Sequence, residues 1–181
     1  MSILRTLALI VFALNGTAVA EWQADAGDAT QLKAQTAMST IREKIPRSGT
    51  YFDEAWGYAV YPSVTRVGFG FGGAWGKGIV IEQGSVVGST SFWQFTSGIQ
   101  AGARNFSMIV FFRDKEALEY FKSGETQFMG QAGLAFATAG IAGTPAYNHG
   151  VAIVTMTRLG IMGEFTISGA KFTFRPAAST Q

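Results

Sequence analysis

The chain has 181 residues, of which 23 are glycine, 14% are charged and 48% are hydrophobic. This apolar content excludes an intrinsically disordered protein, and the glycine content excludes a coiled coil or a long helical rod. A sequence without cysteine has no disulfide scaffold, thiol catalysis or cysteine-based metal site, and a formal charge of +2 gives no electrostatic case for nucleic acid. Composition therefore predicts one globular, strand-rich domain.

Residues 1–20 have the pattern of a secretory signal peptide. Arg5 provides a positive start, Leu7–Leu14 an apolar segment, and Ala18–Ala20 a small-x-small cleavage site. The apolar run is shorter than the roughly 20 residues that span a bilayer, and a retained N-terminal anchor is the alternative. We therefore expect an exported protein of the periplasm, peripherally associated with the membrane, whose mature chain begins at Glu21.

The first predicted helix is Ala29–Ile45, which follows a mobile lead-in at residues 21–28, has Asp28 or Thr30 as its N-cap and ends before Pro46. Its apolar residues share one stripe, and basic residues border that stripe. This pattern suits attachment to an anionic lipid interface; an ordinary amphipathic helix docked on a sheet is the alternative. The candidate lipid-contact residues are Lys33, Met38, Ile41, Arg42, Lys44, Ile45 and Arg47.

Most of the remaining chain has the period-two pattern of β-strands. Gly68, Gly70 and Gly72 alternate with Phe69 and Phe71, so one strand face is bare backbone and the other is aromatic. Further strands are predicted at Val86–Phe95, Gly98–Ala103, Phe106–Phe112, Val151–Arg158, Ile161–Ser168 and Lys171–Arg175, with turns at Leu159-Gly160 and Gly169. A second helix is predicted at Asp114–Lys122.

The predicted fold class is therefore α+β, a mainly antiparallel, meander- or sandwich-like sheet with two flanking helices. The domain spans residues 29–176, and residues 177–181 form a polar tail. The stretch 126–148 carries no charge, and buried strands are favoured there over a membrane helix because its glycine and alanine make it weakly hydrophobic.

An aromatic string gives a second candidate lipid-contact surface. It consists of Phe69, Phe71 and Trp75 together with Lys77. Aromatic residues in such numbers are more often part of a core, so both interpretations stay open at the level of sequence.

Enzymatic chemistry has little support in the sequence. The segment Gly68–Gly73 matches the dinucleotide fingerprint, but the residues after it predict more strand where the fingerprint requires a helix. His149 is the single histidine and no Gly-x-Ser-x-Gly motif accompanies it. Asp53-Glu54 and Glu116/Glu119 are too isolated to form a carboxylate pair. We therefore expect a non-enzymatic protein with no catalytic residue, metal site, cofactor or nucleotide.

Several segments, taken in order, resemble the SYLF domain family. They are YAVYPSV (58–64), GFGFGGAWGKGIV (68–80), GIQAGARNFSMIVFF (98–112), DKEALEYF (114–121) and GVAIVTMTRLGIMGEFTISGAKFTFRP (150–176). The resemblance covers roughly residues 35–176 and is closest to the stand-alone, secreted bacterial branch. The Trp-Ser-x-Pro motif of eukaryotic members is replaced by SFWQFTSG (91–98), and we expect no SH3-like or zinc-finger partner domain.

This resemblance implies a lipid-binding module. Eukaryotic relatives bind phosphoinositides through the domain and its N-terminal amphipathic helix, and a yeast relative binds and bundles actin. An exported bacterial protein meets neither actin nor, usually, phosphoinositides, so the expected partner is anionic phospholipid of the cell envelope. The alternatives are a small outer-membrane β-barrel and a structural or protein-interaction module.

Overall fold

The computed structural model describes residues 22–124, 127–129, 137–138, 147 and 149–178. The predicted signal peptide and most of the uncharged stretch 126–148 lie outside these residues. In chain order the elements are α1 (Ala29–Lys44), the 3-10 helix η1 (Pro46–Ser48), α2 (Gly49–Glu54), β1 (Gly57–Glu82), β2 (Ser85–Phe112), α3 (Lys115–Lys122), β3 (Gln127–Met129), β4 (Ala137–Thr138) and β5 (Val151–Pro176).

The strands form one sheet in the order β1-β2-β5-β3, with β4 also paired to β5. All pairs are antiparallel except the short pairing of β4 with β5. The predicted α+β class with a mainly antiparallel sheet is therefore confirmed. The described helices are more numerous than predicted, because the segment before β1 forms η1 and α2.

The three long strands replace the shorter strands that the sequence suggested. β5 runs without interruption from Val151 to Pro176, and the predicted turns at Leu159-Gly160 and Gly169 are wrong. Gly160 lies opposite Arg104 and Gly169 opposite Phe95, both inside the continuous ladder with β2. A glycine inside a strand bends the backbone without ending the strand when the neighbouring strand continues the pairing.

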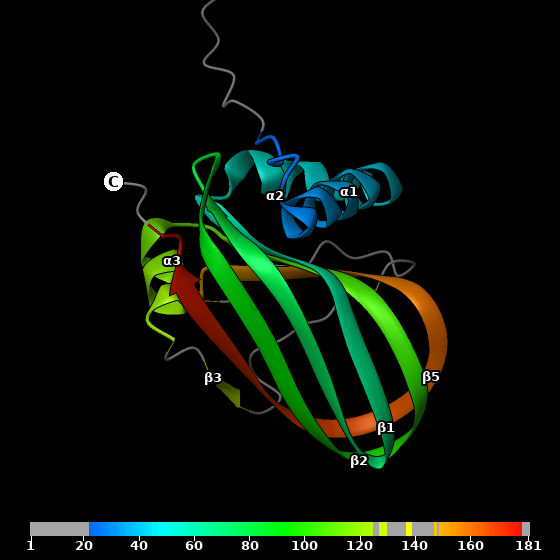
Figure 1. The fold of residues 1–181 in the computed structure, drawn as a ribbon. Coiled ribbons are helices and arrows are strands. Elements are labelled where there is room, and N and C mark those ends of the chain that lie inside the picture. The colour runs from blue at the N-terminus through cyan, green and yellow to red at the C-terminus, as the bar shows by residue number, and fades with distance from the viewer. Residues whose placement is uncertain (1–21, 125–126, 130–136, 139–146, 148, 179–181) are drawn as a thin grey trace, which may run out of the picture.

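A sharp bend divides the long strands in the middle. Gly70 has a φ of +71° and Gly102 a φ of +130°, conformations that favour glycine. Phe69 pairs with Ala101 and Phe71 with Ser97, so residues 98–100 of β2 lie opposite Gly70 alone. This bulge turns the sheet, and Figure 1 shows the bend at the end of the molecule away from α1 and α2.

Beyond the bend, β1 returns to meet its own beginning. A Cβ on Gly78 would collide with the carbonyl oxygen of Val60, and one on Gly76 would lie 3.0 Å from the carbonyl oxygen of Ser63. At the ends of the strand, Gln83 donates from its side chain to the carbonyl oxygen of Trp56 at 2.8 Å. The two halves of β1 therefore cross with their backbones in contact, which requires residues without a side chain at the crossing.

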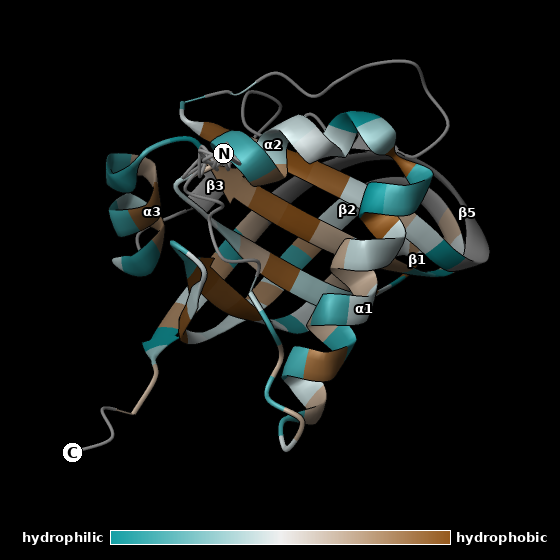
Figure 2. Ribbon diagram, turned by 90° about the horizontal axis from the view of Figure 1, so that it is seen from above, coloured by the Kyte–Doolittle hydropathy of each residue, from teal (hydrophilic) through white to brown (hydrophobic). Residues whose placement is uncertain are grey.

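Two cores fill the opposite faces of the folded sheet. The inner core lies between the halves of the sheet and is rich in aromatic rings, with Phe92 and Phe172 centred 5.1 Å apart and Phe121 of α3 next to Phe172 at 5.6 Å. The outer core lies under α1 and α2, where Figure 2 shows apolar strand segments beneath the helices. Burial of apolar residues on both faces stabilises the long strands along the half nearest the helices.

Helix α1 is fixed at its N-terminal end. Asp28 is its N-cap, and its Oδ1 accepts from the backbone N–H of Thr30 at 2.8 Å and of Gln31 at 3.1 Å. These backbone hydrogen bonds lower the pKa of Asp28. Trp22 is buried in the outer core, so the expectation of a mobile lead-in over residues 21–28 is wrong for Trp22, which anchors this segment by burying its ring.

An ion pair holds α3 against the end of β1. Lys122 donates from Nζ to Glu82 at 2.6 Å and to Glu119 at 3.0 Å, and Trp56 donates from its indole to Glu82 at 3.0 Å. The hydrogen bond from Lys122 is the main cause that lowers the pKa of Glu82 below its ordinary value of 4.5.

We predict that Gly78→Ala lowers stability by about 1–3 kcal/mol, because the new Cβ forces the two halves of β1 apart. Gly49→Ala is the matched control, since a Cβ there has no atom within 4 Å and the residue begins a helix. The control should change stability by less than about 0.5 kcal/mol. Urea denaturation of both variants tests this; equal midpoints would contradict the crossing.

We predict that Glu82→Gln lowers stability at neutral pH by about 1 kcal/mol. Because the pKa of folded Glu82 lies below its ordinary value of 4.5, the pair stabilises the fold above that pH, and this contribution is lost as the pH falls through the lowered pKa. Thermal melting should therefore show that the difference in melting temperature between wild type and Glu82→Gln decreases as the pH is lowered. Glu119 is a more exposed partner of Lys122, so Glu119→Gln should lower the melting temperature at neutral pH by less than Glu82→Gln does. A gap for Glu82→Gln that stays constant into acid would refute the assignment.

Candidate functional site

The apolar stripe of α1 faces the sheet. Met38 and Ile41 are only 5% and 0% exposed, and they pack with Val60 and Phe111 in the outer core. Ile45 is half-buried against the same core. The expectation that Met38, Ile41 and Ile45 enter a lipid interface is therefore wrong, because the apolar outer face of the sheet already covers this stripe.

The basic residues near α1 divide into two groups. Arg42 is half-buried, with its guanidinium carbon 4.3 Å from the ring centroid of Phe52, which is a cation–π contact that ties α1 to α2. Lys33, Lys44 and Arg47 are exposed. Arg42 thus has a structural role, and the other three remain accessible to a ligand.

The aromatic string of β1 lies on the surface. Phe69 is 88% exposed, Phe71 68% and Trp75 42%, and Lys77 is also exposed. These four residues alternate with inward-facing positions, so they share the outer face of the sheet. The core interpretation of this string does not hold for the described structure.

Two further exposed aromatic residues come from β2 and were missed from the sequence. Trp93 is 62% exposed and Phe95 64%, whereas the alternate positions Phe92 and Gln94 are buried. The alternation in SFWQFTS carried this signal, but periodicity alone does not tell which of the two aromatic faces is inward. We call the outward set the bend surface; it consists of Phe69, Phe71, Trp75, Trp93 and Phe95.

The strand register orders the outer face into cross-strand rows. Trp75 pairs with Trp93, which pairs with Lys171 on β5. One same-face step toward α1, Lys77 pairs with Ser91, which pairs with Thr173. Each step along a strand face is about 6.7 Å. The surface therefore changes, over two or three such steps, from rows that carry exposed aromatic residues at the bend to rows that carry cations and hydroxyls above it.

We call the cationic part of this face the basic rim; it consists of Lys77, Lys171 and Arg175, all exposed. A hollow of about 250 Å³ lies beside it, bordered by Lys77, Arg175 and several hydroxyl side chains. The acidic residue at this hollow is Asp28, whose carboxylate already caps α1. The basic rim thus presents positive charge next to the aromatic residues.

Behind the bend surface, the inner face of the sheet is polar. Arg66 is only 4% exposed and donates to the side-chain oxygen of Gln94 at 3.2 Å. Nearer the helices, the hydroxyls of Tyr61 and Thr90 are 2.7 Å apart, and burial raises the pKa of Tyr61. Among the described side chains, the apolar inner core therefore ends before the bend, where Arg66 and Gln94 are buried instead.

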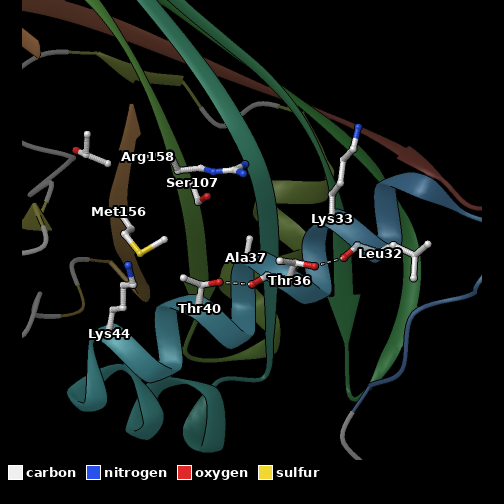
Figure 3. Close-up of a pocket in the computed structure, with 10 residues that line it drawn as sticks. Leu32, Lys33, Thr36, Ala37, Thr40, Lys44, Ser107, Met156 and Arg158 are labelled. Carbon is white, nitrogen blue, oxygen red and sulfur yellow. Dashed lines mark hydrogen bonds between the residues drawn. The ribbon is translucent and has the colours of Figure 1, made fainter. Parts of the chain in front are cut away.

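A second cavity lies between α1 and the sheet, with a volume of about 590 Å³. We call it the helix groove. Figure 3 shows Lys33 and Lys44 toward opposite ends of one helix face, with Arg158 of β5 reaching toward the helix between them. The lining residues are Leu32, Lys33, Thr36, Ala37, Thr40, Lys44, Ser107, Met156, Thr157 and Arg158.

The structure also places the residues of the other site types that were considered from the sequence. The glycines of the GFGFGG segment lie inside β1, with no helix after them to hold a pyrophosphate. Within the described ranges no three residues of His, Cys, Asp and Glu are grouped as metal ligands would be. His149 is an exposed turn residue with a φ of +49°.

The search for membrane-spanning helices gives a negative result for the described part of the chain. None of its helices combines the length and the apolar character needed to cross a bilayer.

Comparison with curated proteins finds a similarity to Beta cell expansion factor A of Aeromonas veronii. The two share 25% identity over 141 residues, which is 77% of this chain and 53% of that protein. This chain thus spans about half the length of the relative. No family model matches the sequence.

Proposed function

We propose that this protein is a non-enzymatic, peripheral lipid-binding member of the SYLF family in the bacterial cell envelope, and that it contacts anionic phospholipid through the bend surface and the basic rim. The observation that carries this proposal is the order of the outer face, from exposed phenylalanines at the bend to tryptophans and then to cations and hydroxyls. The proposed site is thus the second of the two surfaces considered from sequence, extended by residues of β2 and β5, and replaces the first because the apolar stripe of α1 packs on the sheet.

The aromatic residues supply the apolar contact. A contiguous set of exposed Phe and Trp side chains on one face is costly in water and marks an interaction surface. Peripheral proteins bury such a surface about 5–10 Å deep at the headgroup–acyl boundary, where Trp is also favoured because its ring is amphipathic. Phe69 and Phe71, at the bend, would enter first, and Trp75 and Trp93 would lie at headgroup level.

The basic rim supplies the preference for anionic lipid. Lys171 lies beside Trp93 and Lys77 one step further from the bend, so both would stand at the height of the phosphates when the tryptophans are at the interface. Each basic residue near an anionic surface contributes about 1 kcal/mol, and salt screens this contribution. Binding should therefore combine an apolar part that resists salt with an electrostatic part that does not.

Protein–protein interfaces are also rich in aromatic residues, so a protein partner is the alternative to a phospholipid surface. Cations next to exposed Phe and Trp, with hydroxyls around them, favour a phospholipid surface. The name of the relative mentions no ligand, so the lipid ligand is inferred from the surface of this chain and from the SYLF resemblance of its sequence.

We predict that the double variant Phe69→Ser/Phe71→Ser weakens binding to phosphatidylglycerol-containing vesicles by at least about tenfold. The reason is that loss of even part of two phenyl burials exceeds about 1.4 kcal/mol, the equivalent of tenfold in affinity. Both side chains are largely exposed, so the variant should fold like the wild type. Vesicle co-sedimentation of the mature protein measures the effect.

Tyr120→Ser is the control for this experiment, because Tyr120 is an exposed aromatic residue on α3, outside the bend surface. It should bind vesicles like the wild type. Equal binding by the double variant and the control would refute the bend surface as the lipid contact, as would absence of wild-type binding at low salt.

A further inference from the structure

The hollow beside the basic rim lies in the corner between the start of α1 and the outer face of the sheet. Two successive cross-strand rows form its floor: Lys77 with Ser91 and Thr173, and Ile79 with Ser89 and Arg175. Asp28 and Thr30, at the start of α1, add a wall. Its volume of about 250 Å³ is below the roughly 300–1,000 Å³ of pockets for drug-sized ligands, which suits a group the size of a glycerol or a sugar ring.

The polar lining of the hollow contains both donors and acceptors. Lys77 and Arg175 only donate, the carboxylate of Asp28 only accepts, and the serine and threonine hydroxyls can do either. Backbone hydrogen bonds hold the pKa of Asp28 below its ordinary value, so this carboxylate is ionised at neutral pH. Such a set matches the hydroxyl groups of a ligand, because each hydroxyl both donates and accepts.

The charges of the hollow disfavour other common headgroup types. A phosphate inside it would meet the carboxylate of Asp28, and an ammonium group such as that of ethanolamine would meet Lys77 and Arg175. An uncharged polyol meets no like charge there. The lining therefore favours glycerol or a sugar over a charged group.

The hollow lies at the height at which the outermost part of a lipid headgroup would stand. Trp93 and Lys171 occupy one row, and the two rows of the hollow follow at one and two steps of about 6.7 Å each. The headgroup layer is roughly 5–8 Å thick on each side of the hydrocarbon core. With Trp93 at the interface, a phosphate beside Lys171 would therefore place the alcohol that it carries at the first row of the hollow.

We propose that this hollow binds the terminal polyol of an anionic lipid headgroup, a glycerol or a sugar, whose phosphate lies at Lys171 and Lys77. The inference rests on the proposed function and adds a selectivity that charge alone does not give. Two anionic lipids of equal charge should bind with different affinity when only one of them carries hydroxyls in its headgroup.

Vesicles of phosphatidylglycerol and of phosphatidylmethanol test this proposal, because both lipids carry a single negative charge and only phosphatidylglycerol has headgroup hydroxyls. The mature protein should bind phosphatidylglycerol vesicles about tenfold more tightly, which is the order expected for two hydrogen bonds of ordinary net strength. The variant Ser89→Ala/Ser91→Ala should lose this preference. Its affinity for phosphatidylmethanol should stay unchanged, because the substitutions alter no charge.

Ser85→Ala/Ser97→Ala is the matched control, since both serines are exposed residues of β2 that do not line the hollow. This variant should keep the wild-type preference for phosphatidylglycerol, and the melting temperatures of both double variants should match the wild type. Equal loss of the preference in the two double variants would overturn the hollow as the polyol site.

The outcomes separate this proposal from the proposed function. Equal binding of the two lipids by the wild type would leave the bend surface as a lipid contact and overturn the polyol site. If the wild type binds neither vesicle, the proposed function fails, and NMR titration with glycerophosphoglycerol, the soluble headgroup of phosphatidylglycerol, decides the fate of the hollow. Shifts of amide signals at the hollow that are lost in Ser89→Ala/Ser91→Ala would support a free polyol ester as its ligand, and unchanged signals in the wild type would overturn the site.

Discussion

The close crossing of the two halves of β1 is the constraint on which the rest of the structure depends. Gly76 and Gly78 bring backbone against backbone near Val60 and Ser63; a Cβ on Gly78 would displace a strand, and one on Gly76 would crowd Ser63 and Val64. Once this contact closes, β2 must follow β1 through the same bend because it pairs with β1 along almost its whole length, and β5 follows in turn because it pairs with β2. The aromatic inner core and the place of α1 across the outer face follow from this closure.

The closure also explains why aromatic side chains end up in water. Among the described residues, the apolar covers of the folded sheet lie at the end near the helices, where α1, α2 and α3 pack. At the bend the inner face carries polar groups such as Arg66 and Gln94, and the outer face has no helix on it in the described structure. Phe69, Phe71 and their neighbours on β2 are therefore left exposed outside both cores, which is the basis for proposing an interaction surface there.

Local signals predicted much of this fold, and non-local contacts decided the rest. The cap at Asp28, the stop at Pro46 and the helix after Asp114 were readable because each depends on residues within one or two turns. The continuity of β5 was not predictable, because glycines that look like turns stay in a strand only when β2 runs alongside.

The same limit applies to the candidate sites. The stripe of α1 and the aromatic string of β1 are both amphipathic, and only their tertiary partners decide that the first is buried and the second exposed. The position of Arg158 in the groove could not be predicted for the same reason, because Arg158 lies more than a hundred residues after α1 in the sequence.

The most direct measurement of the central claim uses the four tryptophans as depth probes. A protein that retains only Trp93, with Trp22, Trp56 and Trp75 changed to Phe, is mixed with phosphatidylglycerol vesicles whose acyl chains carry bromine, which quenches indole fluorescence on contact. A second protein retains only Trp56, which is exposed beside α2. If the bend surface enters the bilayer interface, Trp93 emission shifts to shorter wavelength and is quenched, while Trp56 emission is unchanged. Vesicle binding with quenching of Trp56 and an unaffected Trp93 would contradict this account and would place the membrane contact at the helices.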